Sequence, residues 1–233
     1  MPDLDHERQF NAPVIGIDEA GRGPWAGPVT VTAIWLCPSA YDTLPAGIDD
    51  SKKIKPPRRA ALAAALMAPP HLSQTVSIEV AQIDQMGILK ATFAGMVMAA
   101  SELANKMVKA GWGAPVHALV DGNLLPPDMP LSATALIKGE SRSLSIAAAS
   151  LIAKTSRDQI MQDLALVYPD YGWASNMGYG TKAHQTGLDQ FGLTPHHRHS
   201  FKPIRRYLDV GDKHTDTAVA FDYFSRQDRF GGS

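Results

Sequence analysis

Residues 14–24 read Val-Ile-Gly-Ile-Asp-Glu-Ala-Gly-Arg-Gly-Pro, an apolar run that ends in two adjacent carboxylates. The run is typical of a buried strand, and the glycines after Asp18 and Glu19 allow backbone to approach a ligand closely. Two like charges about 4 Å apart repel by about 4 kcal/mol at an effective dielectric constant of about 20. A divalent cation such as Mg²⁺ or Mn²⁺, which prefers hard oxygen ligands, relieves that repulsion. The alternative is a solvated strand end followed by a turn.

The composition indicates one large domain, or one domain with a small appendage. The chain has 233 residues, of which 45% are hydrophobic and 19% charged, and this excludes a disordered chain or a coiled coil. The net charge is −1, so a nucleic-acid partner would have to be bound by local basic patches. Cys37 is the only cysteine, which excludes an intramolecular disulfide and favours the cytoplasm. The polar N-terminus and the lack of a long apolar run predict neither a signal peptide nor membrane contact.

Hydrophobic periodicity predicts an α/β fold. Strands are predicted at 13–18, 28–36, 74–80, 115–120 and 133–138. Helices are predicted at 56–68, 81–110, 142–167 and 182–191, the second of them broken near Gly87. This order favours a mixed sheet with an antiparallel start rather than a strictly alternating βαβ arrangement.

Two further acids follow predicted strands. Asp121 ends the strand at 115–120, and Glu140 follows the strand at 133–138. Ligands of open α/β sheets collect at the carboxyl ends of strands, so these acids are expected to converge with Asp18 and Glu19. Four carboxylates can hold two Mg²⁺ ions, which activate water and stabilise the leaving oxygen of a phosphodiester. Each acid taken alone is better explained as structural or solvated, and only their joint placement favours a metal site.

Two basic stretches and one tyrosine are candidates for substrate contact. Residues 51–59 carry five cations, and residues 196–206 form a second stretch without acids. Either stretch alone is typical of a solvated face, but beside an acidic metal site they predict a groove that follows phosphates. Tyr179 lies between two glycines, so its ring is free to meet a base or a sugar.

Several other enzyme classes are excluded by missing motifs. No Gly-Lys dipeptide exists, so the chain has no P-loop. Residues 21–24 do not continue as a dinucleotide-binding fingerprint, and neither a Gly-x-Ser-x-Gly elbow nor a His-Glu-x-x-His motif is present. The three histidines near position 197 lack the cysteines or the paired histidine spacing of a zinc site.

Seven motifs follow one another along the chain: Asp18-Glu19-Ala20-Gly21-Arg22-Gly23-Pro24, Asp50-Ser51-Lys52-Lys53, Asp121-Gly122, Lys138-Gly139-Glu140, residues 145–154 with Arg157-Asp158, Gly178-Tyr179-Gly180-Thr181 with His184, and His197-Arg198-His199-Ser200-Phe201. In this order, the set resembles bacterial ribonuclease HII, the type 2 ribonucleases H. The resemblance covers about residues 12–208.

The resemblance implies a ribonuclease H-like mixed sheet flanked by helices, with a small C-terminal helical extension. The catalytic domain would span 12–208 and include substrate-contacting helices and a loop at about 168–208. Residues 1–11 and 209–233 would be flexible or loosely docked tails. The implied protein is a cytoplasmic monomer that binds RNA–DNA hybrids and acts in ribonucleotide excision from DNA. No sliding-clamp motif is evident at its C-terminus.

The implied activity is endonucleolytic cleavage of RNA in RNA–DNA hybrids, and incision 5′ to a single ribonucleotide in duplex DNA. A two-metal site with Mn²⁺ or Mg²⁺ is implied at Asp18, Glu19, Asp121 and Glu140. The resemblance also implies substrate-binding roles. Recognition of the ribose 2′-hydroxyl falls on Gly21, Arg22 and Gly23, contact with phosphates on Ser51 and Lys52, and stacking at the RNA–DNA junction on Tyr179.

One departure concerns the fourth acid, which is usually aspartate in the family and is Glu140 here. Its longer arm keeps the charge and moves the carboxylate by about one methylene, and Asp158 is a nearby acid that could share the role. The sequence alone leaves two alternative functions. One is another two-metal nuclease of this fold, such as a junction resolvase, and the other is a non-catalytic nucleic-acid-binding module.

Overall fold

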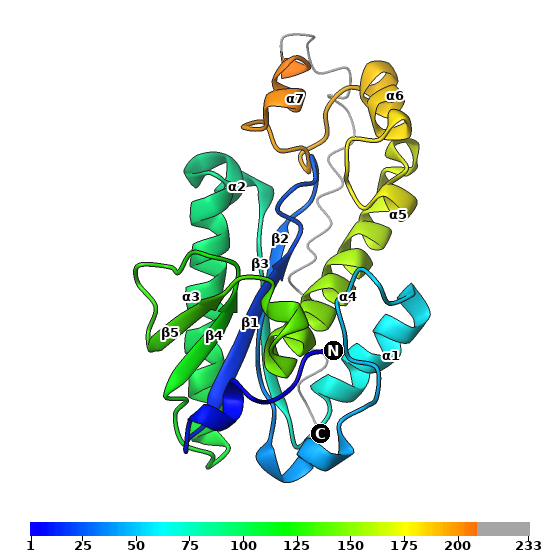
Figure 1. Cartoon of the computed structure of the whole chain (residues 1–233). Helices are drawn as coiled ribbons and strands as arrows, with labels where there is room; N and C mark the ends of the chain where they lie inside the picture. The colour runs from blue at the N-terminus through cyan, green and yellow to red at the C-terminus, as the bar shows by residue number, and fades with distance from the viewer. Residues whose placement is uncertain (209–233) are drawn as a thin grey trace.

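The computed structural model describes residues 1–208, which form an α/β fold around one five-stranded sheet (Figure 1). The strands are β1 (Val14–Ala20), β2 (Val29–Trp35), β3 (Leu72–Ile78), β4 (His117–Asp121) and β5 (Ser132–Leu136). Their order across the sheet is β3-β2-β1-β4-β5. Each of the five predicted strands is present and overlaps its predicted range.

The central strand, β1, determines where the acids lie. It pairs antiparallel with β2 and parallel with β4, while β3 continues the antiparallel side and β5 the parallel side. The predicted antiparallel start is therefore confirmed. Because β1, β4 and β5 run in one direction, their carboxyl ends meet at one edge of the sheet. The register that pairs Ile17 with Val120 brings the next residues, Asp18 and Asp121, side by side at that edge.

Helices cover both faces of the sheet. They are α1 (Pro56–Met67), α2 (Val80–Met86), α3 (Ile88–Lys109), α4 (Leu144–Val167), α5 (Trp173–Asn176), α6 (Lys182–Phe191) and α7 (Lys202–Arg205), with short 3₁₀ helices η1 (Glu7–Gln9), η2 (Pro38–Thr43), η3 (Gly139–Ser141) and η4 (Pro169–Tyr171). Figure 1 shows α3 on one face and α4 on the other, with α1 packed outside α4. The predicted break at Gly87 is confirmed, since this residue separates α2 from α3 with a φ of 82°.

Alternation along the strands divides the core in two. On one face, Ile15 and Ile17 of β1 pack with buried side chains of α3 such as Leu103. On the other face, Ile34 of β2 packs with Leu151 of α4 and with α1. Since successive side chains of a strand point to opposite faces, Asp18 lies on the α4 face, next to the helix rather than in the α3 core.

Gly16 lets α4 approach β1 at backbone distance. A Cβ at this position would overlap the backbone of Ser145 in the first turn of α4. The close packing sets α4 directly along β1, and two residues beyond Gly16 the strand delivers Asp18 beside the same helix. A glycine in a strand interior is typical of such a close approach.

The C-terminal part of the described chain forms a smaller core of its own at the far end of α4 (Figure 1). Met161 of α4 packs there with Trp173 of α5, Leu188 of α6 and Ile204 of α7. These short helices correspond to the predicted C-terminal helical extension. Ala26, from the loop between β1 and β2, also belongs to this core, so the extension is attached to the catalytic edge of the sheet.

The N-terminal residues are packed more firmly than predicted. Leu4 is buried, and Glu7 is only 5% exposed. One carboxylate oxygen of Glu7 accepts hydrogen bonds from the Ser143 hydroxyl, at 2.6 Å, and from the Ser145 N–H and hydroxyl, at 2.9 and 2.6 Å. Within the segment predicted as loosely docked, Leu4 and Glu7 are thus buried, and Glu7 binds donors at the N-terminus of α4.

Residues 209–233, predicted as a second loose tail, lie outside the described residues, as would any clamp-binding peptide there. Within residues 1–208, no single helix is long and apolar enough to cross a membrane, and only α2 and α3 together pass that test, as a pair bent by 119°.

Candidate active site

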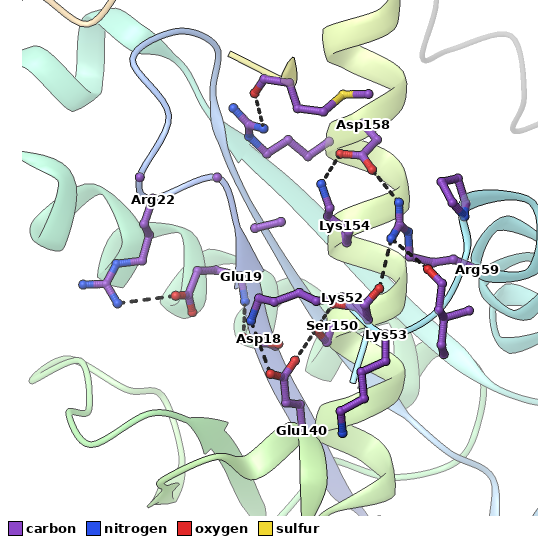
Figure 2. A pocket seen from close by; sticks show the side chains of 18 of the residues that line it. Asp18, Glu19, Arg22, Lys52, Lys53, Arg59, Glu140, Ser150, Lys154 and Asp158 are labelled. Atoms are coloured by element: carbon purple, nitrogen blue, oxygen red, sulfur yellow. Dashed lines mark hydrogen bonds and ion pairs between the residues drawn. The ribbon is translucent and has the colours of Figure 1, made fainter. Parts of the chain in front are cut away.

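All ten residues predicted to form the site line one cleft of about 770 Å³ at the carboxyl edge of the sheet. Asp18 and Glu19 come from the end of β1, Asp121 from the end of β4, and Glu140 from η3, directly after β5. Figure 2 shows Asp18, Glu19 and Glu140 facing the cleft, beside α4. The residues predicted to contact the substrate line the same cleft: Gly21, Arg22, Gly23, Ser51, Lys52 and Tyr179.

Hydrogen bonds fix two of the acids relative to the helices. An oxygen of Asp121 accepts from the N–H of Gly139 at 2.6 Å, which joins the end of β4 to η3. Glu140, one residue further, accepts from the hydroxyl of Ser150 on α4 at 3.2 Å. The hydroxyls of Ser150 and Ser51 are also hydrogen-bonded, at 3.0 Å. Ser150 therefore links the acid Glu140 to the segment that carries Lys52.

The acids at the end of β1 are crowded by burial and by one another. Burial raises the pKa of Asp18 well above its usual value, and the nearby charges of Glu19 and Asp121 raise it further. Burial also raises the pKa of Glu19, and Asp121 adds to this, while Arg22 opposes it. These shifts express the cost of holding several negative charges in one place. A divalent cation would remove that cost.

The donor set fits Mg²⁺ or Mn²⁺, since all four side chains offer hard oxygen ligands. As the side chains stand, however, no group of three or more acidic, histidine or cysteine side chains within residues 1–208 is arranged to hold a metal ion. Two of the four acids are turned toward cations instead. Glu19 pairs with Arg22 at 3.4 Å, and Glu140 pairs with Lys52 at 3.3 Å (Figure 2). Metal binding by Glu19 and Glu140 would therefore compete with these two ion pairs.

Asp158, the other acid considered for metal binding, is already neutralised. Its two oxygens bind Arg59 at 2.8 Å and Lys154 at 2.6 Å (Figure 2). Arg59 is itself only 7% exposed and donates to the backbone carbonyl of Ser51 at 2.9 Å. This ion-pair network holds α1 and the loop of Ser51 against α4, which is a structural role.

The two glycines beside Arg22 differ in the space around them. Gly21 has a φ of +95°, and a Cβ there would overlap the guanidinium of Arg157. Gly23 has an ordinary backbone conformation, and a Cβ there would meet only Cε1 of Tyr179, at 3.4 Å. The first glycine is thus needed for folding of the loop, whereas the second leaves open space in the cleft.

These surroundings predict different outcomes for two alanine substitutions. Gly21→Ala should lower the free energy of unfolding by about 1–3 kcal/mol, through backbone strain alone, and more through the clash with Arg157. Gly23→Ala should leave the melting temperature unchanged and still lower cleavage, because its methyl group occupies the space that a ligand would need. Melting curves and cleavage rates of the two variants, measured together, test this. Equal melting temperatures for both variants would contradict it.

The loop that carries Tyr179 is held by a buried histidine pair. The ring nitrogen Nε2 of His184 accepts from the indole N–H of Trp173 at 3.2 Å, so its Nδ1 carries the hydrogen that is donated to the carbonyl of Tyr179 at 3.0 Å. His197 Nε2 lies 3.0 Å from the same Nε2 of His184. Burial lowers the pKa of both histidines, to about 3 for His197, and keeps them neutral. The side chain of Tyr179 itself is 49% exposed at the cleft.

The second predicted basic stretch does not form a wall of this cleft. None of residues 196–206 lines it, and His197 and Arg198 are completely buried. The prediction of a phosphate-following groove is therefore wrong for His197 and Arg198, because His197 packs against aromatic rings of the C-terminal core and Arg198 donates to backbone carbonyls of residues 21–28. The first stretch does line the cleft through Lys52, Lys53 and Lys55, with Lys52 78% exposed.

Comparison with known proteins agrees with this geometry. A model of the ribonuclease HII family matches residues 15–204. The chain belongs to the ribonuclease HII family. The ribonuclease HII of Jannaschia sp. (strain CCS1) is 45% identical over 208 residues, which cover 89% of this chain and 98% of that relative. As a member of the family, the chain is a metal-dependent endoribonuclease that acts on RNA–DNA hybrids.

Solved structures share the fold. The ribonuclease H2 from Pyrococcus horikoshii OT3 has a TM-score of 0.69 and 22% identity, covering 85% of this chain and 98% of its own. Bst-RNase HIII in complex with Mn²⁺ has a TM-score of 0.71 and 19% identity, and the match covers 89% of this chain and 73% of that protein. The predicted ribonuclease H-like fold is confirmed.

Sequence reasoning missed the part of the ribonuclease HII cleft that α4 supplies. Ser150, Lys154 and Arg157 follow one another at spacings of four and three, so one side of the helix presents all of them to the cleft. This spacing was visible in the sequence, but Ser150 lies in the mostly apolar first half of α4, which hid its place in the polar stripe. Arg59 was counted among the basic residues, although the structure uses it as the buried partner of Asp158.

Proposed function

We propose that Asp18, Glu19, Asp121 and Glu140 bind two divalent ions, Mg²⁺ or Mn²⁺, for hydrolysis of a phosphodiester. When bound, such ions supply the charge that activates an attacking water and stabilises the leaving oxygen. The observation that carries the proposal is the meeting of these four acids, from three neighbouring strand ends, in the same cleft as residues 21–23 and Tyr179.

The other residues of the cleft bind and orient the substrate. The side chain of Lys52 is exposed, so it can leave Glu140 for a phosphate, and Ser51 lies next to it. The backbone of Gly21, Arg22 and Gly23 approaches the ribose 2′-hydroxyl, the only group that distinguishes this sugar from deoxyribose. The ring of Tyr179 stacks on the deoxyribose that follows the ribonucleotide.

This arrangement supports incision 5′ to a single ribonucleotide in duplex DNA, with 3′-hydroxyl and 5′-phosphate products. The cellular role would be ribonucleotide removal from DNA by a cytoplasmic monomer. The test is cleavage of a duplex that carries one ribonucleotide, in Mg²⁺ and in Mn²⁺, with the cut position mapped. A cut elsewhere, or cleavage of an all-DNA four-way junction instead, would contradict the proposal.

Replacing Lys52 and Lys53 together with alanine should weaken binding to hybrid and duplex alike. Each phosphate contact contributes about 0.9 to the slope of log K against log salt, so the slope should become flatter by up to about 1.8. The measurement is affinity for an RNA–DNA hybrid between low and moderate salt in the absence of cleavage. Lys106→Ala with Lys109→Ala, at the C-terminal end of α3, is the matched control and should leave the slope unchanged.

A further inference from the structure

Two arginines are buried behind the loop of Gly21 and Gly23. Arg157 is 1% exposed and Arg198 is 0% exposed. Neither forms an ion pair with any carboxylate of residues 1–208. Burial lowers the pKa of Arg157 to about 10 and that of Arg198 to about 9, and for Arg198 the neighbouring charge of Arg157 adds to the effect. Burying a charge without a counter-ion costs free energy. The hydrogen bonds of each guanidinium offset this cost, and their acceptors show which part of the chain the arginine holds in place.

The side chain of Arg198 donates only to backbone carbonyls of the loop between β1 and β2. Its Nε donates to the carbonyl of Gly27 at 2.9 Å, and one terminal nitrogen donates to Arg22 at 3.0 Å. The other terminal nitrogen donates to Gly21 at 2.6 Å and to Pro28 at 3.0 Å. A single planar guanidinium thus holds both ends of the loop that connects β1 to β2. Lysine, with donors on one atom, cannot span these four carbonyls.

These contacts also fix the N–H groups that face the other way. The carbonyl of Gly21 and the N–H of Arg22 belong to one rigid trans peptide, as do the carbonyl of Arg22 and the N–H of Gly23. Holding the two oxygens therefore aims the two N–H groups in the opposite direction. Neither N–H has an acceptor within residues 1–208, so both are available to a ligand in the cleft.

Arg157 joins this loop to the one that carries Tyr179. It donates to the carbonyls of Pro28 at 2.9 Å and Ala26 at 3.0 Å, and to the carbonyl of Met177 at 3.0 Å. The backbone repeats the connection, since the N–H of Trp25 donates to Gly178 at 2.8 Å. The two loops are therefore linked to each other by Arg157 and by a backbone hydrogen bond.

From this geometry we propose that Arg198 is a positioning residue for ribose selection, because it sets the direction of the N–H groups of Arg22 and Gly23. The inference rests on the proposed function of that loop. Arg198 touches no substrate and lies behind the loop, completely buried. Its loss would loosen the placement of one 2′-hydroxyl without changing the acids.

The test is the Arg198→Lys variant, assayed on a duplex with one ribonucleotide and on an RNA–DNA hybrid. The single ribonucleotide must be placed in one register, whereas a hybrid offers a 2′-hydroxyl in every register. A small misplacement at an active site costs up to about 100-fold in rate, so cleavage of the one-ribonucleotide duplex should fall about 10- to 100-fold relative to the hybrid. Partial unfolding lowers both rates equally and leaves their ratio unchanged.

Arg8→Lys, the same change at an exposed arginine of η1, is the control and should leave the ratio unchanged. If the unaltered protein does not incise at the single ribonucleotide, the proposed function fails and this inference fails with it. If it does incise and Arg198→Lys keeps the ratio, the inference alone is overturned.

A second variant covers the case in which Arg198→Lys does not fold. Asp84 of α2 accepts from the N–H groups of His199 and Ser200, each at 2.9 Å, and so holds the segment that carries Arg198. Asp84→Ala removes these bonds and keeps the buried arginine. It should lower the same ratio by a smaller factor, and an unchanged ratio in this variant would overturn the inference.

Discussion

Replacing Asp121 with asparagine should reduce cleavage of an RNA–DNA hybrid by about 100- to 10,000-fold while binding stays measurable. Asparagine has the shape of aspartate, and its carbonyl oxygen can still accept the hydrogen bond from Gly139 that joins β4 to η3. Only the charge is lost. Charge stabilisation of the transition state by metal ions is worth several kcal/mol, and each 1.36 kcal/mol corresponds to about a tenfold change in rate.

The matched control is Asp128→Asn, an exposed acid in the loop between β4 and β5. This variant should cleave like the unaltered protein, so that a loss confined to Asp121→Asn can be assigned to the cleft. The measurement is a single-turnover cleavage rate, with hybrid affinity measured beside it. A turnover near that of the unaltered protein in Asp121→Asn would remove Asp121 from the proposed metal site.

Replacing Glu140 with glutamine should cause a comparable loss, of about 100-fold or more, since a ligand charge disappears from the same site. The amide oxygen can still accept from Ser150, so the contact with α4 survives. Glu140→Asp should retain or even improve activity, because it keeps the charge and restores the acid that is usual in the resembled family. Cleavage rates in Mg²⁺ and in Mn²⁺ distinguish the two variants.

Asp158→Asn supplies the comparison for Glu140. It breaks a buried ion-pair network with Arg59 and Lys154, and such losses cost about 3–5 kcal/mol of stability. The protein that stays folded should keep its specific activity. The opposite pattern, in which Glu140→Gln cleaves normally and folded Asp158→Asn does not, would show that the fourth ligand is Asp158.

The sequence was sufficient for the sheet and for the convergence of the acids. Periodicity placed the five strands, and Asp18, Asp121 and Glu140 each followed one of them, so the rule for strand ends brought them together. These features depend on local pattern and on chain direction, both of which can be read from the residues. Family membership agrees with this result and favours the nuclease over a non-catalytic module.

Buried polar partners could not be predicted in the same way. Arg198 lies in a basic stretch that looks like a solvated face, and nothing in its neighbours along the chain announces four carbonyls from residues 21–28. Glu7 is similar, because its donors belong to Ser143 and Ser145, far away in sequence. Such contacts depend on tertiary packing, which hydrophobic patterning does not specify.

The packing of α4 on β1 at Gly16 gives the cleft a fixed length scale. Arg157, which binds the carbonyls of Ala26 and Pro28, lies seven positions after Ser150, which contacts Glu140. At 1.5 Å per residue they are about 10 Å apart, or about three steps of 3.4 Å along a nucleic-acid strand. One residue inserted between these two positions would rotate one contact by about 100° relative to the other. The two contacts could then not form together, so this part of α4 has a fixed length. Insertions in relatives are therefore expected in the loops around the cleft and not between these two positions.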